Sequence, residues 1–322
     1  MRKILVVSYS QTGQLTKVVD SIIGPLLNDE HIQVDSLIIK PKEEYPFPWS
    51  FFKFFQVMPE SVYMKKIELE DTVINHGSIE NSHKNNSDQF NDIDKPYDLI
   101  ILSYQVWFLS PSLPISSFLQ SEQAKALFNN TPVMTVLGCR GMWLTAQEKM
   151  KSLLKKLNAN LIDNIVLTDE CGAGFSFLAT PLWMLTGKKK PLSWVPTAGI
   201  SEQDISQAQR FGIALNNRLN QDDNKISTPV MTNLAAVKIN EKFIFSEKIG
   251  HRSFKVWGKL LMLLGPPNSL RRYAGLCFYS LFLIALIITV VPITALIIKL
   301  ITPIFKNKIA KQKAYYAQPS GE

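Results

Sequence analysis

A short run of hydroxyl-bearing and glycine residues near the start of the chain has the composition of a phosphate-binding loop. The hydroxyls of Ser10, Thr12 and Thr16 can donate hydrogen bonds to phosphate oxygens, and Gly13 lets the backbone approach an anion closely. The run precedes a predicted helix, whose N-terminal N–H groups favour an anion without any Lys or Arg contact. The predicted binding residues are Ser10, Gln11, Thr12, Gly13, Gln14, Leu15 and Thr16.

The same run excludes three better-known phosphate sites. It lacks the GxxxxGK pattern of nucleoside triphosphatases and the GxGxxG pattern of dinucleotide-binding loops, so NAD is disfavoured as a tightly held cofactor. Ser8, Tyr9 and Ser10 follow the first predicted strand, where a phospho-receiver domain would need acidic residues.

Two later stretches have residue types that suit a flat ring. Trp107 and Phe108 present aromatic faces that can stack on a ligand, although ordinary core packing is the alternative. Arg140 and the neighbouring glycine amides could stabilise negative charge. The predicted ring-binding residues are Tyr104, Gln105, Val106, Trp107, Phe108, Gly138, Cys139, Arg140 and Gly141.

The elements that must position these residues alternate between strands and helices. Short apolar runs predict strands at 3–8, 32–39, 98–103, 132–137 and 161–167. Helical spacing predicts helices at 14–27, 114–119, 143–157 and 201–219, the last with Ser201 as its N-cap. The alternation predicts an α/β fold with a doubly wound, five-stranded parallel sheet of flavodoxin-like order.

Two insertions interrupt this pattern. The segment 41–96 begins with an aromatic block at 45–55 and continues with a polar stretch at 75–94, which we predict to be a loop. The segment 168–197 contains aromatic residues, glycines and the basic run 188–190. We therefore predict a flavodoxin-like domain at 1–220 with insertions 41–96 and 168–197, a linker at 221–253, and membrane-associated helices with a basic tail at 254–322.

The C-terminal region is apolar enough to meet a bilayer. Residues 274–298 contain no charge, and residues 254–264 resemble an interfacial helix. Basic residues flank the apolar run on both sides, and the positive-inside rule places both flanks in the cytoplasm. A single span cannot satisfy that rule, whereas a hairpin folded at Pro292 could; a buried core helix is the remaining alternative.

Net charge, cysteine content and histidine content argue against several other classes of function. The formal net charge is +8, and the positive charge gathers around the apolar tail rather than on a recognition helix, so nucleic-acid binding is not expected. Three separated cysteines and four scattered histidines predict neither a disulfide framework nor a metal site. The apolar run at 4–7 is too short for a signal peptide, and we expect the protein at the cytoplasmic face of the bacterial inner membrane.

Ser10-Gln-Thr-Gly13 after a first strand resembles the flavodoxin phosphate loop. That family usually has Thr two positions after the glycine, where this chain has Leu15. The stretch 104–108 is similar to the aromatic ring-binding loop of quinone reductases of this fold. The resemblance implies FMN as the cofactor, with the flavin ring on the loops after the third and fourth strands.

A second resemblance extends along most of the chain. Phe47-Pro-Trp49, Phe54-Phe55 with Pro59-Glu60, and the tail at 319–322 are similar to the dialkylresorcinol condensing enzymes of bacterial pigment clusters. The resemblance implies an FMN-dependent oxidoreductase that aromatises a dialkyl-cyclohexanedione made by a ketosynthase partner. Candidate bases are Glu60, Glu170 and Tyr104.

Two other functions stay open. A membrane-bound NAD(P)H:quinone reductase would share the fold, the FMN and an apolar substrate, and the lysines at 188–190 could then bind a 2′-phosphate or, alternatively, lipid head groups. A membrane-anchored scaffold without flavin is the non-enzymatic alternative.

Overall fold

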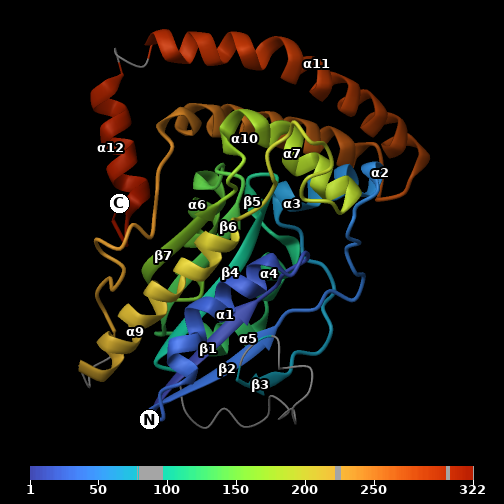
Figure 1. Cartoon of the computed structure of the whole chain (residues 1–322). Coiled ribbons are helices and arrows are strands. Elements are labelled where there is room, and N and C mark those ends of the chain that lie inside the picture. Colours follow the sequence, from blue (N-terminus) through green and yellow to red (C-terminus); the bar gives the residue numbers. More distant parts are fainter. Residues whose placement is uncertain (78, 80–96, 222–225, 302–304, 322) are drawn as a thin grey trace.

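The computed structural model describes residues 1–77, 79, 97–221, 226–301 and 305–321. A twisted sheet forms its centre, with helices on both faces (Figure 1). Five strands are parallel, and they lie across the sheet in the order β2 (Ile32–Ile38), β1 (Arg2–Ser8), β4 (Leu99–Trp107), β6 (Pro132–Cys139) and β7 (Asn160–Thr168). All five predicted strands are confirmed.

The sheet is mixed rather than purely parallel, which corrects the prediction. The short strand β3 (Ile74–His76), from inside the first insertion, pairs antiparallel with β2 at the edge. β5 (Ser110–Pro111) pairs antiparallel with the end of β4. The predicted loop at 75–94 therefore begins with strand residues, and residues 78 and 80–94 lie outside the described part of the chain.

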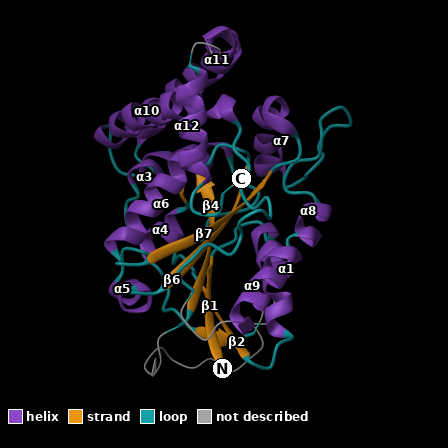
Figure 2. Ribbon diagram, turned by 90° about the vertical axis from the view of Figure 1, so that its left-hand side faces the viewer, coloured by secondary structure: helices purple, strands orange, loops and turns teal. Residues whose placement is uncertain are grey.

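Helices cover both faces because the strands are apolar on both sides. In β1, Ile4 and Val6 belong to one core, and Leu5 and Val7 belong to the other. The first core is covered by α1 (Gln14–Leu27), α8 (Glu202–Gln207) and α9 (Gln209–Gln221), and the second by α4 (Leu113–Phe118), α5 (Glu122–Phe128) and α6 (Leu144–Lys156) (Figure 2). The predicted helix at 201–219 is thus two helices, and Ser201 accepts a hydrogen bond from the N–H of Asp204 as its cap.

The helices of the two insertions gather beyond the carboxyl ends of the parallel strands (Figure 1). The first contains α2 (Phe51–Gln56) and α3 (Met58–Tyr63). The second contains α7 (Gly172–Thr186), which the glycine-rich sequence did not suggest.

The segment 221–253 is not a free linker, in contrast to the prediction. The N–H groups of Val230 and Met231 donate to the carboxylate of Asp163 at 2.7 and 3.2 Å, so this stretch is fixed to β7. The helix α10 (Glu241–Leu263) then begins inside the predicted linker.

The apolar helix α11 (Leu270–Ile301) is continuous through residue 292, which contradicts the alternative of a hairpin folded at Pro292. It is the one helix in the described residues long and apolar enough to cross a membrane, and only 17% of its most apolar window is buried. That low burial contradicts the alternative of a core helix. After α11, α12 (Lys306–Ala317) descends to the α/β domain (Figure 1).

The contact between α1 and α9 gives a sharp test of this fold. A Cβ on Gly212 would lie 1.8 Å from the carbonyl oxygen of Ile22, because the two helices touch backbone to backbone there. We expect Gly212→Ala to lower the free energy of unfolding by about 3 kcal/mol or more. Denaturant titration of the full chain measures the change.

Gly24, inside α1, is the matched control, since a Cβ there meets no atom within 4 Å. Gly24→Ala should leave stability unchanged or raise it by up to about 1 kcal/mol, because alanine favours helix more than glycine does. Equal effects of the two substitutions would contradict this packing.

Candidate functional site

The loop between β1 and α1 is shaped to receive an anion. Gly13 has φ of +74°, a left-handed conformation that only glycine adopts readily, and it turns the chain into α1. Gly13 has no side chain to cap α1, and the N–H of Gln14 donates only a long hydrogen bond to Thr12 Oγ1, at 3.5 Å, so the first turn of α1 lacks a strong side-chain cap. The Oγ of Ser10 is buried and has no hydrogen-bond partner in the described chain. A phosphate would satisfy both a buried hydroxyl without a partner and a weakly capped helix start.

The other predicted residues of this loop have different roles. Gln11 Nε2 donates to the carbonyl of Pro46 at 2.9 Å, and Gln14 exchanges two hydrogen bonds with the backbone of Ile200, both at 3.1 Å. These glutamines brace the loop against the first insertion and the chain before α8. Leu15 is buried in the core. The groups of this loop that stay candidates for binding a phosphate are the backbone, Ser10 and the hydroxyls of Thr12 and Thr16.

A cluster of aromatic rings lies beside this loop. The ring of Trp107 makes edge contacts with Tyr9, Tyr45 and Trp49, at centroid distances of 5.9, 4.9 and 5.8 Å. The aromatic block of the first insertion therefore folds onto the end of β4. Trp107 is held by its neighbours and presents only part of its surface to a ligand.

The turn after β4 has an unusual backbone. Phe108 and Leu109 have φ of +48° and +58°, and they form a two-residue turn between the paired residues Trp107 and Ser110. Bulky side chains rarely adopt positive φ, and such outliers gather at functional sites. Phe108 itself contacts Phe54 at 5.0 Å.

The sequence suggested that the stretch 104–108 is a loop. Because β4 extends to Trp107, Tyr104, Gln105 and Val106 are strand residues instead. Tyr104 is fully buried on the α6 face, and its hydroxyl donates to Gln147 Oε1 at 2.5 Å. Burial raises the pKa of Tyr104 well above its usual value, so it is a core residue rather than a base. Val106 pairs with Pro111, and Gln105 has a buried Oε1 without a partner in the described residues.

The strand β6 ends in the second predicted ring-binding stretch. Gly138 and Cys139 are its last residues, and burial raises the pKa of the Cys139 thiol to about 12, so the thiol stays protonated. Burial lowers the pKa of Arg140, while the nearby carboxylate of Asp169 opposes that shift. Gly141 has φ of +112° and carries the chain away from the strand. Arg140 thus brings a largely desolvated positive charge to this edge.

Asp169 was missed by the sequence analysis. It accepts hydrogen bonds from the N–H of Cys171 at 3.0 Å and from Thr180 Oγ1 at 2.9 Å. These bonds fix the start of α7 at the end of β7. An acidic residue directly after a predicted strand was the available signal.

Glu247 was also missed, and it decides where an anion can bind. Its carboxylate accepts hydrogen bonds from the N–H groups of Leu144 at 3.2 Å and Thr145 at 2.9 Å, so α10 caps the start of α6. The protein's own carboxylate fills this helix terminus, whereas the start of α1 has no such cap. A phosphate at this edge of the sheet therefore belongs on α1.

Lys149 of α6 fixes the turn after β4 by hydrogen bonds. Its Nζ donates to Ser110 Oγ at 2.7 Å and to the carbonyl of Val62 at 2.8 Å. Burial, with a smaller contribution from Lys255, lowers the pKa of Lys149 to about 7. The amine therefore links α6, α3 and the hairpin.

The structure separates the two acidic candidate bases. Glu60 forms an ion pair with Arg272 at 2.5 Å and is thereby tied to α11. Glu170 is exposed just after β7, at the carboxyl edge of the sheet. No group of three potential metal ligands occurs in the part of the chain that the structure describes.

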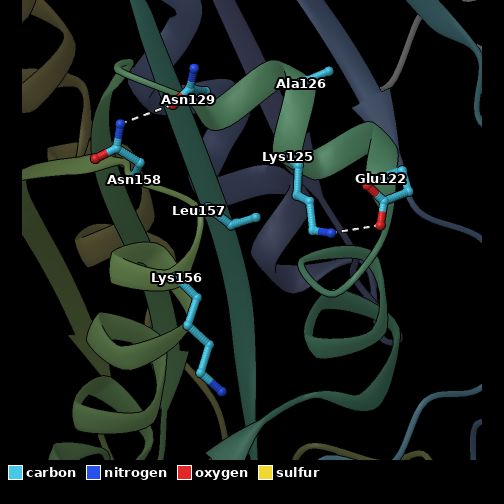
Figure 3. Close-up of a pocket in the computed structure, with 7 residues that line it drawn as sticks. All are labelled: Glu122, Lys125, Ala126, Asn129, Lys156, Leu157 and Asn158. Carbon is cyan, nitrogen blue, oxygen red and sulfur yellow. Dashed lines mark hydrogen bonds and ion pairs between the residues drawn. The ribbon is translucent and has the colours of Figure 1, made fainter.

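A surface hollow of about 520 Å³ lies elsewhere, between α5 and the end of α6 (Figure 3). It is lined by the Glu122–Lys125 ion pair and by Asn129 and Asn158, which hydrogen-bond to each other at 2.9 Å. These residues precede β6 and β7, so the hollow lies at the amino ends of the strands, away from the phosphate loop.

The strand order β2-β1-β4-β6-β7 corresponds to 2-1-3-4-5 among the parallel strands, with the loop after the first strand at the point where the order reverses. The fold is flavodoxin-like. No model of a known protein family matches the chain, and no curated protein matches it.

Solved structures that resemble the chain are flavoproteins and flavodoxins. A flavoprotein in complex with FMN from Lactobacillus acidophilus is 18% identical, with 52% of this chain and 93% of that chain covered and a TM-score of 0.37. Oxidised flavodoxin 1 from Bacillus cereus is 11% identical, with 66% and 95% covered and a TM-score of 0.32. A flavodoxin from the domain Archaea is 11% identical, with 69% and 100% covered and a TM-score of 0.32.

The buried cap of α6 predicts a pH effect. Burial raises the pKa of Glu247 from 4.5 to about 7 in the folded protein. The stability that this group contributes is fully present below about pH 4.5 and is lost as the pH rises through about 7. The free energy of unfolding is measured for the unmodified chain and for Glu247→Gln at each pH. The first value minus the second should fall by on the order of 3 kcal/mol between pH 4.5 and 8.

Glu202→Gln is the control, since Glu202 is exposed at the start of α8. Its difference should stay flat over the same range. A flat difference for Glu247→Gln would mean that this carboxyl is solvated in the folded protein.

Proposed function

We propose that the chain binds FMN at the carboxyl edge of its sheet. The single observation that carries the proposal is the buried Oγ of Ser10, which has no partner in the described residues, beside the weakly capped start of α1 and an aromatic cluster. The backbone at 10–14 with the hydroxyls of Ser10, Thr12 and Thr16 would hold the phosphate. The turn at Trp107 and Phe108, and the loop at Arg140 and Gly141, would hold the ring.

With FMN bound, the protein would act as an enzyme on an apolar substrate rather than as an electron carrier. Aromatic side chains from both insertions meet at this edge, where Phe47 contacts Trp183 at 5.9 Å and Trp49 contacts Phe54 at 5.9 Å. These rings exclude water and offer an apolar surface beside the ring site. The large apolar helix α11 lies at the same end of the molecule, so we propose action at the cytoplasmic face of the bacterial inner membrane (Figure 1).

We propose oxidative aromatisation of a dialkyl-cyclohexanedione to a dialkylresorcinol as the reaction, with the dione supplied by a ketosynthase. FMN would supply a two-electron acceptor for the hydride removed from the ring. The second hydrogen leaves as a proton from a carbon made acidic by the neighbouring carbonyls, which needs only a modest base. Of the candidate bases, Glu170 is exposed at the correct edge, while Arg140 could balance negative charge near the ring.

A membrane-bound NAD(P)H:quinone reductase is the second candidate. It is favoured by Lys188 and Lys190, which are exposed after α7 and could meet a 2′-phosphate. A scaffold without flavin is the third possibility, and it would leave Ser10 and the start of α1 without a ligand.

An absorption spectrum of the detergent-purified full chain tests these alternatives first. We expect flavin bands that bleach on anaerobic mixing with a 2,5-dialkyl-cyclohexane-1,3-dione without NADPH. Bleaching with NADPH alone would replace the aromatase with the quinone reductase. If no flavin band appears after incubation with excess FMN, the proposed cofactor is wrong.

The phosphate loop gives a second prediction. Ser10→Ala removes a hydroxyl that would donate to a charged phosphate, so the dissociation constant for FMN should rise about 10-fold. Ser103→Ala is the matched control, because its Oγ is also buried without a partner in the described residues but lies within β4. Quenching of flavin fluorescence on binding measures both constants, and equal constants for the two variants would place the phosphate elsewhere.

A further inference from the structure

We infer that the chain is a monotopic membrane protein, in which α11 lies flat within one leaflet of an anionic bilayer instead of crossing it. The inference rests on the proposed membrane association and adds its geometry: both ends of the apolar helix stay on the side of the α/β domain. Four observations carry it, namely the anchors at each end of α11, the exposed apolar surface and the distribution of charge.

The first end of α11 is fixed to the α/β domain by a buried ion pair. Arg272 is 1% exposed, and its two terminal nitrogens bind the two carboxylate oxygens of Glu60 at 2.8 and 2.5 Å. One of them also donates to the carbonyl of Gln56 at 2.7 Å. Because breaking a buried pair leaves an uncompensated charge, α11 cannot leave α3 at this point without a large cost.

The second end is fixed to the same domain through α12. Ile309 and Ala317 are buried in the core that α6 covers. Ser320 Oγ donates to Asp163 at 2.9 Å and accepts from the N–H of Asn164 at 2.6 Å, both in β7. The C-terminal tail is therefore part of the sheet's support.

These anchors exclude a crossing. α11 has 32 residues and is about 48 Å long, enough to traverse a hydrocarbon core of about 30 Å. If it did so, α12 would emerge on the far side. The chain between Ile301 and Lys306 spans at most about 18 Å and could not bring α12 back to β7.

The helix instead forms the outermost layer at the carboxyl edge of the sheet (Figure 1). Leu281 and Ile288 on α11 are each 69% exposed, and Leu263 at the end of α10 is 74% exposed. A helix about 10 Å wide fits within one half of the hydrocarbon core. Other exposed apolar residues of α11 and α10 are Phe278, Ile284, Val290, Ile293, Val256 and Leu260.

Charge identifies the surface that this layer meets. Residues 248–322 contain eleven Lys and Arg residues and one acidic residue, whereas the preceding 247 residues contain 24 basic and 26 acidic residues. The entire positive excess therefore accompanies the apolar helices. Lys255 and Lys259 on α10 and Lys306 and Lys308 on α12 are exposed near its two ends, where they can bind anionic head groups.

The flat helix also meets the proposed site through a continuous series of ring contacts. Tyr273 of α11 contacts Phe52 at 5.7 Å, and the series continues through Phe51, Phe55, Phe54 and Trp49 to Trp107, with each centroid distance below 6 Å. These ring contacts form an apolar connection between α11 and Trp107.

Site-directed labelling tests the topology. The background is Cys277→Ser, because Cys277 is the exposed cysteine, whereas Cys139 and Cys171 are shielded and burial raises the pKa of both thiols. Lys259→Cys on α10 and Lys308→Cys on α12 are each expressed in the full chain. A membrane-impermeant maleimide should label both variants in inverted membrane vesicles and neither in intact spheroplasts. Labelling of Lys308→Cys from the outer face would establish a crossing and overturn the inference.

Vesicle flotation tests whether the chain binds an anionic bilayer. The purified chain should float with vesicles of phosphatidylglycerol and phosphatidylcholine, and Lys306→Gln with Lys308→Gln should weaken its partitioning about 30-fold. Lys155→Gln with Lys156→Gln, at the end of α6, removes the same charge and should have no effect. Equal losses, or no flotation at all, would overturn the inference. Neither experiment needs flavin. If the protein gives the expected result in both but shows no flavin band after incubation with FMN, only the proposed cofactor is wrong.

Discussion

Five parallel strands can end on only one edge of their sheet, and this constraint organises the whole molecule. The loops after β1, β4, β6 and β7 must meet at that edge. The helices of both insertions and the helices α10 and α11 lie there too (Figure 1). The loop at 10–16, the aromatic cluster and the apolar surface are therefore neighbours by topology, although more than three quarters of the chain separates the loop from α11 in sequence.

The pair between Glu60 and Arg272 shows how an added layer is held on such an edge. A buried guanidinium contributes little net stability, because its desolvation offsets most of its attraction to the carboxylate. The pair instead fixes geometry. The planar guanidinium binds both carboxylate oxygens of Glu60 on α3 and the carbonyl of Gln56 on α2, which defines how α11 leaves the domain. Glu247 does the same for α10 by capping α6. Polar bonds thus orient helices that apolar packing alone would leave free to slide.

Much of this architecture could be predicted from residue patterns. Strands buried on both faces and the amphipathic helix α1 have strong local signals, and α1 has the predicted bounds. Tyr104 could not be placed until β4 was known to reach Trp107; its alternation with Ile100 and Leu102 then puts it in the core. Glu247 and Arg272 could not be assigned at all, because their partners lie 103 and 212 positions away. Side chains whose roles depend on such contacts need the fold first.

Under the proposed function, the helix starts at this edge would keep a flavin phosphate and lipid head groups apart. Both are anions, and both would compete for exposed N–H groups and lysines. The carboxylate of Glu247, from α10, fills the start of α6, so neither anion can bind there. The start of α1 has no such carboxylate, and Gln11 in the loop before it is tied to Pro46 of the first insertion. Exposed lysines lie on α10 and α12, whereas residues 8–16 contain no lysine, so the two proposed anions would bind at different places.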